Sequence, residues 1–314
     1  MILSDLEGAN MAKQITVAAT TCFFLLAGCS QESTSTGTTA TSESAVVVAE
    51  TSSVAPSIAA QLSAGPSLSA LEFGGPNLLF AASNDNGTVY AYTLSDNDIG
   101  EAVDRPTPYN FENFGTQLSH FLGVAPFDIA YNDMVVHPVS SAAFLSLTIR
   151  QADGDKPSLV RVTQDGAYAL IDTRELETPS VTLHDPASAD MVFWRDIPAA
   201  SLTVTDLEFN DGKLFVAGLS TGEFASTLRQ FDYPFTGSQS ASSIEMFHTA
   251  HNQNETRAPI RAMAIAPVNG EPTLIAAYTC TPLVTIPAES LMDGAHVVGK
   301  TIAELGYGNV PVEV

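Results

Sequence analysis

Asp206-Leu207-Glu208-Phe209 and Leu214-Phe215-Val216-Ala217-Gly218 flank the turn sequence Asn210-Asp211-Gly212. This pattern predicts a short strand, a tight turn and a second, more apolar strand that ends in small residues. A strand pair of this kind recurs three times, which indicates a repeated supersecondary unit. The three further pairs are Ala70-Leu71-Glu72-Phe73 with Leu78-Leu79-Phe80-Ala81-Ala82, Asp133-Met134-Val135-Val136 with Ala143-Phe144-Leu145-Ser146-Leu147, and Ala262-Met263-Ala264-Ile265 with Leu274-Ile275-Ala276-Ala277-Tyr278.

A third predicted strand follows each pair. These strands are Thr88–Leu94, Leu159–Val162, Leu228–Phe231 and Leu283–Ile286. Gly, Asn and Asp mark the turns, and we find no convincing long amphipathic helix. Units of three or four antiparallel strands, repeated radially, are the blades of a β-propeller. We therefore predict an all-β domain over residues 67–314, a β-propeller with about four recognisable blades whose small residues allow neighbouring sheets to pack closely.

The repeat also resembles known propeller families. Its anchor positions, Leu71, Met134, Leu207 and Met263, lie farther apart than the roughly 40–45 residues of a WD40 blade, so we expect insertions between blades. Arg195 follows the single tryptophan, Trp194, so the Trp-Asp signature is missing. The chain therefore resembles the divergent bacterial propellers called WD40-like or YVTN-like, and segments 215–228, 255–257 and 278–283 resemble an exported propeller family with no assigned activity. Because such folds host many functions, the resemblance implies an architecture and not a reaction.

The last residues predict an incomplete ring. Val312-Glu313-Val314 has the composition of a strand start and follows the loop-like segment 305–311. A propeller exposes raw sheet edges unless its ring closes. Four blades and a strand stub therefore indicate C-terminal truncation, and the alternative is a small ring that N-terminal strands close.

Leu26-Ala27-Gly28-Cys29 ends the apolar run 15–26 and resembles the lipobox of bacterial lipoproteins. The run is shorter than the roughly 20 residues that span a bilayer, and its length suits a signal peptide. We predict that residues 1–28 are this signal peptide. Its true start is expected at Met11, because residues 1–10 carry two acidic residues and no basic one.

The lipobox resemblance implies that Cys29 is diacylated on sulfur and acylated, for example with palmitate, on nitrogen. Two or three acyl chains make a stable membrane anchor. Ser30 follows the cysteine, which favours the outer membrane, so we expect a periplasmic or surface-facing protein of the cell envelope. Residues 29–66 are rich in Ser and Thr and predict a disordered tether. The alternative is an ordinary cleaved signal peptide with a chance cysteine.

Cysteine content and charge narrow the function further. Cys22 leaves with the predicted signal peptide and Cys29 is lipidated, so Cys280 remains as a single thiol and no internal disulfide is expected. The net charge of −23 argues against nucleic-acid partners. We interpret the acidic residues as a solvated surface of a monomer; the alternative is calcium at the turn that carries Asp96 and Asp98.

The candidate site comes from propeller geometry, in which loops entering the first strand share a face with loops joining the second and third strands. In the fourth unit these are loops 247–259 and 279–282. We expect their polar residues and the adjoining strand ends to converge at one rim. The candidates are His248, His251, Glu255, Arg257, Arg261, Tyr278 and Cys280. We expect His120, His184 and His296 to be isolated.

Two functions remain open for this rim. Imidazole and thiolate groups form a metal set, with His248 and His251 as the leading ligands, and Cys280 beside a histidine forms a nucleophile pair. Solvated histidines, a local Glu255–Arg257 ion pair and a buried cysteine are the competing interpretation. The first hypothesis is therefore a lipid-anchored binding module for a protein, glycan or small molecule. The second is a propeller enzyme or a metal or redox protein.

Overall fold

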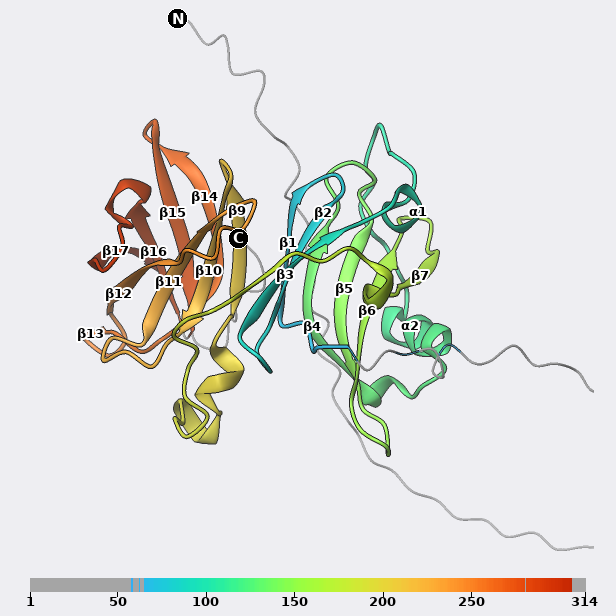
Figure 1. Cartoon of the computed structure of the whole chain (residues 1–314), viewed down its shortest axis with the longest axis horizontal. Helices are drawn as coiled ribbons and strands as arrows, with labels where there is room; N and C mark the ends of the chain where they lie inside the picture. The colour runs from blue at the N-terminus through green and yellow to red at the C-terminus, as the bar shows by residue number, and fades with distance from the viewer. Residues whose placement is uncertain (1–57, 59–61, 63–64, 280, 307–314) are drawn as a thin grey trace, which may run out of the picture. The chain divides into compact units, whose positions relative to one another are not determined.

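The computed structural model describes residues 58, 62 and 65–306 apart from Cys280 (Figure 1). The chain divides into Met1–Pro56 and a compact unit, Ser57–Val314. The predicted signal peptide, Cys29 and Val312–Val314 lie outside the described residues, as does most of the predicted tether. Among the described helices, none is long and apolar enough to cross a membrane.

The described chain is all-β, as predicted, and the strands within each of the four predicted repeat units pair antiparallel. The first unit contains β1 (Ala70–Gly75), β2 (Leu78–Ser83) and β3 (Thr88–Thr93); the second contains β4 (Ile129–Val136), β5 (Ala143–Ile149), β6 (Lys156–Val162) and β7 (Tyr168–Ile171). The third contains β9 (Asp206–Asn210), β10 (Lys213–Leu219), β11 (Ser226–Asp232) and β12 (Ser240–His248), with β13 (Gln253–Glu255) paired to β12. The fourth contains β14 (Ile260–Val268), β15 (Glu271–Tyr278), β16 (Pro282–Pro287) and β17 (His296–Glu304).

Short elements connect these strands. The α-helices are α1 (Asp96–Ile99) and α2 (Phe114–Leu122), and β8 (Ser180–Thr182) lies between the second and third units. The 3₁₀ helices include η2 (Pro126–Asp128), η3 (Thr173–Glu175), η4 (Trp194–Asp196), η5 (Ala199–Leu202) and η6 (Ala288–Ser290). Helix α2 was not predicted; its buried Leu118 and Leu122 cover one face of the second unit. Ile58 and Leu62, which the sequence analysis placed in the tether, pack against the same core.

Turn residues explain the first hairpin of the third and fourth units. Asp211 and Gly212, between β9 and β10, have φ values of 47° and 75°. Asn269 and Gly270, between β14 and β15, have φ values of 53° and 86°. Two successive positive φ values characterise the two-residue hairpin loop whose twist matches that of the flanking strands. Asn, Asp and Gly tolerate this conformation, so these turns hold each first strand against the second.

Neighbouring units pack through the faces of their sheets. Small residues of the second strands, including Ala81, Ala217 and Ala276, are fully buried, as the sequence pattern predicts. Separate apolar clusters join the first unit to the second, the first to the third, and the third to the fourth. Burial of apolar side chains therefore stabilises the junctions between units as well as the sheets themselves.

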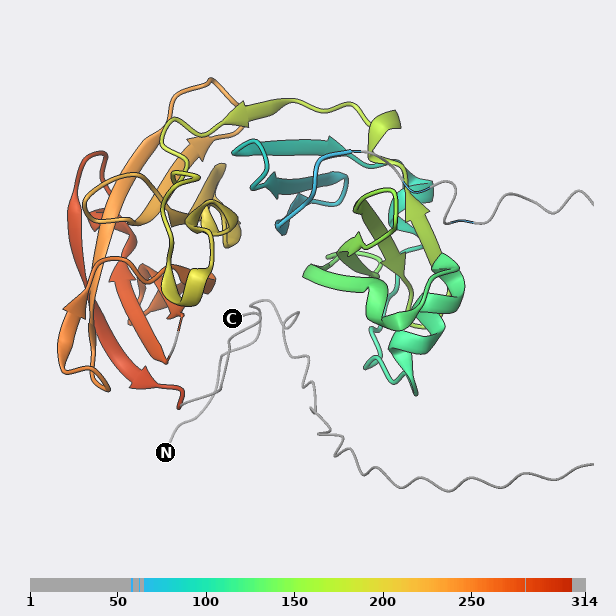
Figure 2. The ribbon, with the colours of Figure 1, turned by 90° about the horizontal axis from the view of Figure 1, so that it is seen from below.

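The units do not follow one another in chain order. The first strands of the units lie side by side in the order β4, β1, β9, β14, so the first unit lies between the second and the third (Figure 2). After the second unit the chain returns along the first, where β8 pairs with β3 through Thr88↔Thr182 and Tyr90↔Ser180. It then enters the third unit. This return connection is what separates the second unit from the third.

The third and fourth units share one sheet. Strand β12 pairs in parallel with β17 through Ser243↔His296 to Met246↔Gly299, which gives a nine-stranded sheet with β13 as a side branch. Its two end strands, β9 and β14, also lie side by side, so the sheet nearly closes on itself. Core residues such as Ile244, Met263 and Val284 fill its interior.

Aspartate carboxylates join neighbouring first strands. Asp133 of β4 accepts a hydrogen bond from the Leu71 amide of β1 at 2.7 Å, and buried Asp206 of β9 accepts one from the Met263 amide of β14 at 2.6 Å. Both aspartates occupy the same position of the repeat, just before the anchor residue. Ala70 stands at that position in the first unit.

The junction between the first and third units uses a different side chain. Asn84 accepts a hydrogen bond from the Val204 amide at 2.7 Å and donates to the Val204 carbonyl at 3.1 Å. The Asn84 side-chain amide therefore makes two hydrogen bonds to the backbone at this junction, where the first unit has no aspartate at the repeat position.

Replacing Asp206 by Ala should lower the free energy of unfolding by about 1–3 kcal/mol, because the Met263 amide loses its acceptor inside the protein. Asp155→Ala, which removes an exposed carboxylate, should change it by less than about 0.5 kcal/mol. Urea denaturation measures both values. Equal effects of the two substitutions would show that the Asp206 contact does not join the units.

Gly218→Ala should be more damaging than a typical core substitution. Gly218 has a φ of 159°, and a Cβ there would lie 2.0 Å from the Thr203 carbonyl oxygen, so β10 and the backbone after η5 must separate. We expect a loss of about 3 kcal/mol or more in unfolding free energy. Gly75→Ala, where a Cβ meets nothing within 4 Å, is the control. Comparable melting temperatures for the two variants would contradict this account.

Candidate functional site

The two loops predicted to meet at one rim are in contact. The Thr279 amide donates to the Pro259 carbonyl at 3.0 Å, and His248 Nε2 lies 3.1 Å from Thr281 Oγ1. The rim therefore gathers the end of β12, the β12–β13 turn, β13, the start of β16 and the end of β17. Here and below, His248, His251, Glu255, Thr281 and Glu304 are called the rim cluster.

The β12–β13 hairpin places the two histidines. Pairing of His248 with Gln253 leaves residues 249–252 as the loop. Within it the His251 amide donates to the His248 carbonyl at 3.2 Å, and Asn252 takes a φ of 51°. Asn tolerates the left-handed conformation better than most residues, so it allows the chain to turn back here. The tight loop brings the two imidazole rings to a centroid separation of 4.0 Å.

Glu255 lies between the two histidines. His248 Nδ1 is 3.1 Å from Glu255 Oε1, and His251 Nδ1 contacts the same oxygen. These three residues are the group of ligating side chains found within the described residues, with ligand atoms within 4.8 Å of one another. His248 is 1% exposed, whereas the His251 side chain is 51% exposed. The site thus has a buried side and a side open to solvent.

A second carboxylate supports the buried side. The Thr281 hydroxyl donates to Glu304 Oε2, and Glu304 Oε1 accepts from the Thr249 amide at 2.8 Å. Glu304 Oε2 lies 3.9 Å from His248 Nε2. His248 is consequently held between Glu255 on one ring edge and the Thr281–Glu304 pair on the other.

Both carboxylates titrate below the ordinary glutamate range. Burial alone would raise the pKa of Glu255, but hydrogen bonding and charge from His251 and His248 hold it lower. Burial would also raise the pKa of Glu304, and the bonds from Thr281 and Thr249 together with the charge of His248 outweigh it. The two acids are therefore ionised at neutral pH.

The remaining predicted site residues lie apart from this cluster or outside the described residues. Arg257 is exposed and Arg261 is half-buried. Tyr278 is fully buried in the core between the third and fourth units, where burial raises the pKa of its hydroxyl. Cys280 is not among the described residues. Of the seven candidates, His248, His251 and Glu255 are those that the structure gathers.

The Asp96 and Asp98 turn has a local structural role. Asp98 accepts hydrogen bonds from the Ser95 amide at 2.9 Å and from the Ser95 hydroxyl at 2.6 Å, and Ser95 caps α1 in return. This reciprocal arrangement is a capping box that starts the helix. The ligating group found among the described residues does not include Asp96 or Asp98.

His296 was expected to be isolated, and this expectation is wrong. Its Nε2 lies 3.1 Å from Glu245 Oε2, its Nδ1 lies 2.9 Å from Ser243 Oγ, and its ring packs 4.3 Å from that of Phe224. The parallel pairing of β12 with β17 creates the contacts with Glu245 and Ser243. His137, in contrast, is fully buried, with Nε2 2.7 Å from the Pro76 carbonyl.

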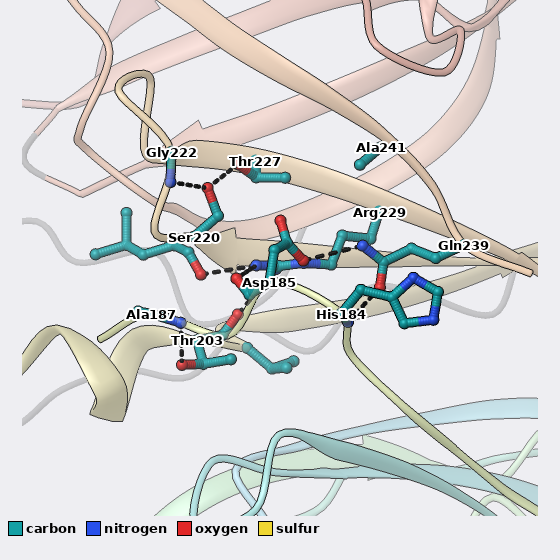
Figure 3. Close-up of polar contacts among 12 residues, drawn as sticks. His184, Asp185, Ala187, Thr203, Ser220, Gly222, Thr227, Arg229, Gln239 and Ala241 are labelled. Atoms are coloured by element: carbon teal, nitrogen blue, oxygen red, sulfur yellow. Dashed lines mark hydrogen bonds and ion pairs between the residues drawn. The ribbon is translucent and has the colours of Figure 1, made fainter. Parts of the chain in front are cut away.

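Sequence reasoning missed a buried arginine in the third unit. Arg229 of β11 is fully buried and donates through Nε to Asp185 Oδ1 at 2.7 Å (Figure 3). It also donates to the carbonyls of Thr203, Asp185 and Leu219 at 3.1, 3.1 and 2.8 Å. Gln239 donates to the same Asp185 oxygen at 2.9 Å. The sequence signal for it is a lone arginine between the apolar residues Leu228 and Phe231 of a predicted strand.

The Arg229 network fastens the connection between units. Asp185 and Thr203 belong to the segment that leaves β8 and enters the third unit, and Leu219 ends β10. The guanidinium is committed to four protein acceptors, so its function is to hold this segment rather than to receive a ligand. Gly218 supports the same arrangement, because its lack of a side chain lets the Thr203 backbone approach β10.

Comparisons with known proteins leave the family open. No family model matches the chain, and no curated protein is significantly similar to it. A similar solved structure is that of a Bacteroides uniformis ATCC 8492 protein provisionally described as a 6-phosphogluconolactonase, with 11% sequence identity, covering 74% of this chain and 71% of that one. Its TM-score of 0.22 is too low to support an argument about fold or activity.

Arg229→Met should lower the free energy of unfolding by about 3–5 kcal/mol, because it leaves Asp185 and three carbonyls without their donor. Lys213→Met is the matched control, since the Lys213–Asp232 pair is 50% and 65% exposed and should contribute only about 0–1 kcal/mol. Chemical denaturation measures both. If the two substitutions lower the free energy of unfolding equally, the network does not hold the segment.

Proposed function

We propose that this chain is an exported lipoprotein that presents a β-propeller-type binding module at the cell envelope. The observation that carries the binding proposal is the meeting of loops 247–259 and 279–282 at one rim. Loops gathered at one edge of a rigid β scaffold are the usual place for recognition. The expected ligand is a protein, a glycan or a small molecule.

The repeat supports a propeller with about four blades. Each unit is an antiparallel sheet of at least three strands, and the first strands lie side by side. Neighbouring sheets pack face to face through small residues, as blades do. The return of the chain along the first unit distinguishes this arrangement from a ring of consecutive blades.

The anchor proposal rests on Leu26-Ala27-Gly28-Cys29. Acyl chains on Cys29 would hold the module at the membrane, with the outer membrane favoured by Ser30. A Ser- and Thr-rich tether would let the module reach away from the surface. The net charge of −23 disfavours nucleic acids as partners.

A metal-dependent or redox protein, or an enzyme at the same rim, is the second candidate. The specific observation in its favour is the gathering of His248, His251 and Glu255. Two imidazoles and a carboxylate are a ligand set that proteins use for zinc. The partly exposed His251 would give a substrate access to such an ion.

Lipid attachment tests where the module acts. The full chain, expressed in a Gram-negative host with an alkyne-tagged palmitate, should be labelled and should sediment with membranes. Cys29→Ser should abolish labelling and release the protein from membranes, because it removes the acylated thiol. Cys280→Ser should leave both unchanged. Labelling that persists in Cys29→Ser, or its absence in the unmodified chain, would refute the lipoprotein proposal.

A further inference from the structure

The protons around His248 can be assigned from the hydrogen bonds of Thr281. A threonine hydroxyl has one proton to donate, and that of Thr281 goes to Glu304. Toward His248 Nε2, at 3.1 Å, Thr281 can therefore act only as an acceptor. It follows that His248 carries a proton on Nε2.

This assignment leaves an excess of acceptors on the other side of the ring. A neutral imidazole has one N–H, so Nδ1 of a neutral His248 presents a lone pair. Its neighbour at 3.1 Å is Glu255 Oε1, a carboxylate oxygen that also presents lone pairs. His251 Nδ1 approaches the same oxygen. Buried acceptors that face one another need a positive charge between them.

We propose that His248 Nδ1, His251 Nδ1 and Glu255 Oε1 bind one Zn²⁺ ion. Each of the three residues offers a ligand atom within 4.8 Å of the others, and both Nδ1 atoms contact Glu255 Oε1. A tetrahedral zinc at 2.0–2.1 Å from each requires separations of about 3.4 Å, so a small movement suffices. His251 can supply it, because its side chain is half-exposed on a hairpin turn.

The surroundings match those of a zinc ligand. Histidine ligands of metals usually donate their second N–H to an oxygen acceptor that fixes the ring. His248 Nε2 has such an acceptor in Thr281, which is in turn fixed by Glu304. Imidazole nitrogens favour zinc and similar transition metals over calcium and magnesium, which prefer oxygen. Three protein ligands leave a fourth position that faces solvent beside His251.

A proton is the competing occupant. In that case His248 is a buried imidazolium between Glu255 and Glu304, and the cluster is a structural ion-pair network. Zinc and the proton occupy the same lone pair on Nδ1. Zinc uptake by the cluster therefore decides between them.

The full chain is stripped with a chelator and titrated with Zn²⁺ at pH 7.5 against a chromophoric zinc indicator. We expect one tightly bound equivalent. His251→Ala and Glu255→Gln should each weaken it more than about 100-fold, and Thr281→Val about 10–100-fold, because Thr281 only orients His248. His120→Ala removes an exposed histidine elsewhere and should leave the affinity unchanged.

Three results would overturn the proposal: no zinc binding, equal binding by His251→Ala, or loss of binding in Cys280→Ser. A cooperative thermal unfolding transition of the metal-free variants would establish that they are folded. We expect this for His251→Ala, because the substitution removes only a half-exposed side chain. X-ray absorption at the zinc edge adds a second readout. We expect nitrogen and oxygen neighbours around the zinc, and a sulfur neighbour would exclude the proposed site. The palmitate experiment is a separate readout, so the zinc site can fail while the lipoprotein proposal stands, and the reverse.

Discussion

A side-chain carboxylate that accepts a backbone N–H from the neighbouring unit is the contact on which the arrangement of the sheets depends. Asp206 makes it to Met263, and Asp133 makes the same contact to Leu71. A hydrogen bond to a carboxylate oxygen is directional. Apolar packing brings neighbouring sheets together without direction, and these bonds set the register at which they meet.

That register determines the rim. When Asp206 holds β9 beside β14, the far strands of the same two units, β12 and β17, come close enough to pair. Their pairing brings the end of β17, with Glu304, next to the end of β12, with His248. The rim cluster is therefore a product of how the third and fourth units close on each other.

The two polar clusters of the third unit differ in what they leave available. Arg229 donates to four acceptors of the protein, and its buried charge is balanced by Asp185. Around His248 the ring nitrogen Nδ1 lies 3.1 Å from Glu255 Oε1, and one side of the cluster is open to water at His251. The first arrangement is complete without a ligand. The second gathers three side chains that can ligate a metal, which is why it carries the functional proposals.

The strands and their turns were predictable from sequence, because alternation and residues such as Asp211-Gly212 act on near neighbours. The meeting of loops 247–259 and 279–282 was predicted from the propeller geometry that the repeat implies. Local patterns could not show that β8 returns to the first unit, that β12 pairs with β17, or that Thr281 and Glu304 join the site. These features depend on the fit of surfaces between residues far apart in the chain, and such contacts leave no periodic signal. The sequence thus specified the repeating unit, and packing between units specified their order and assembled the rim cluster.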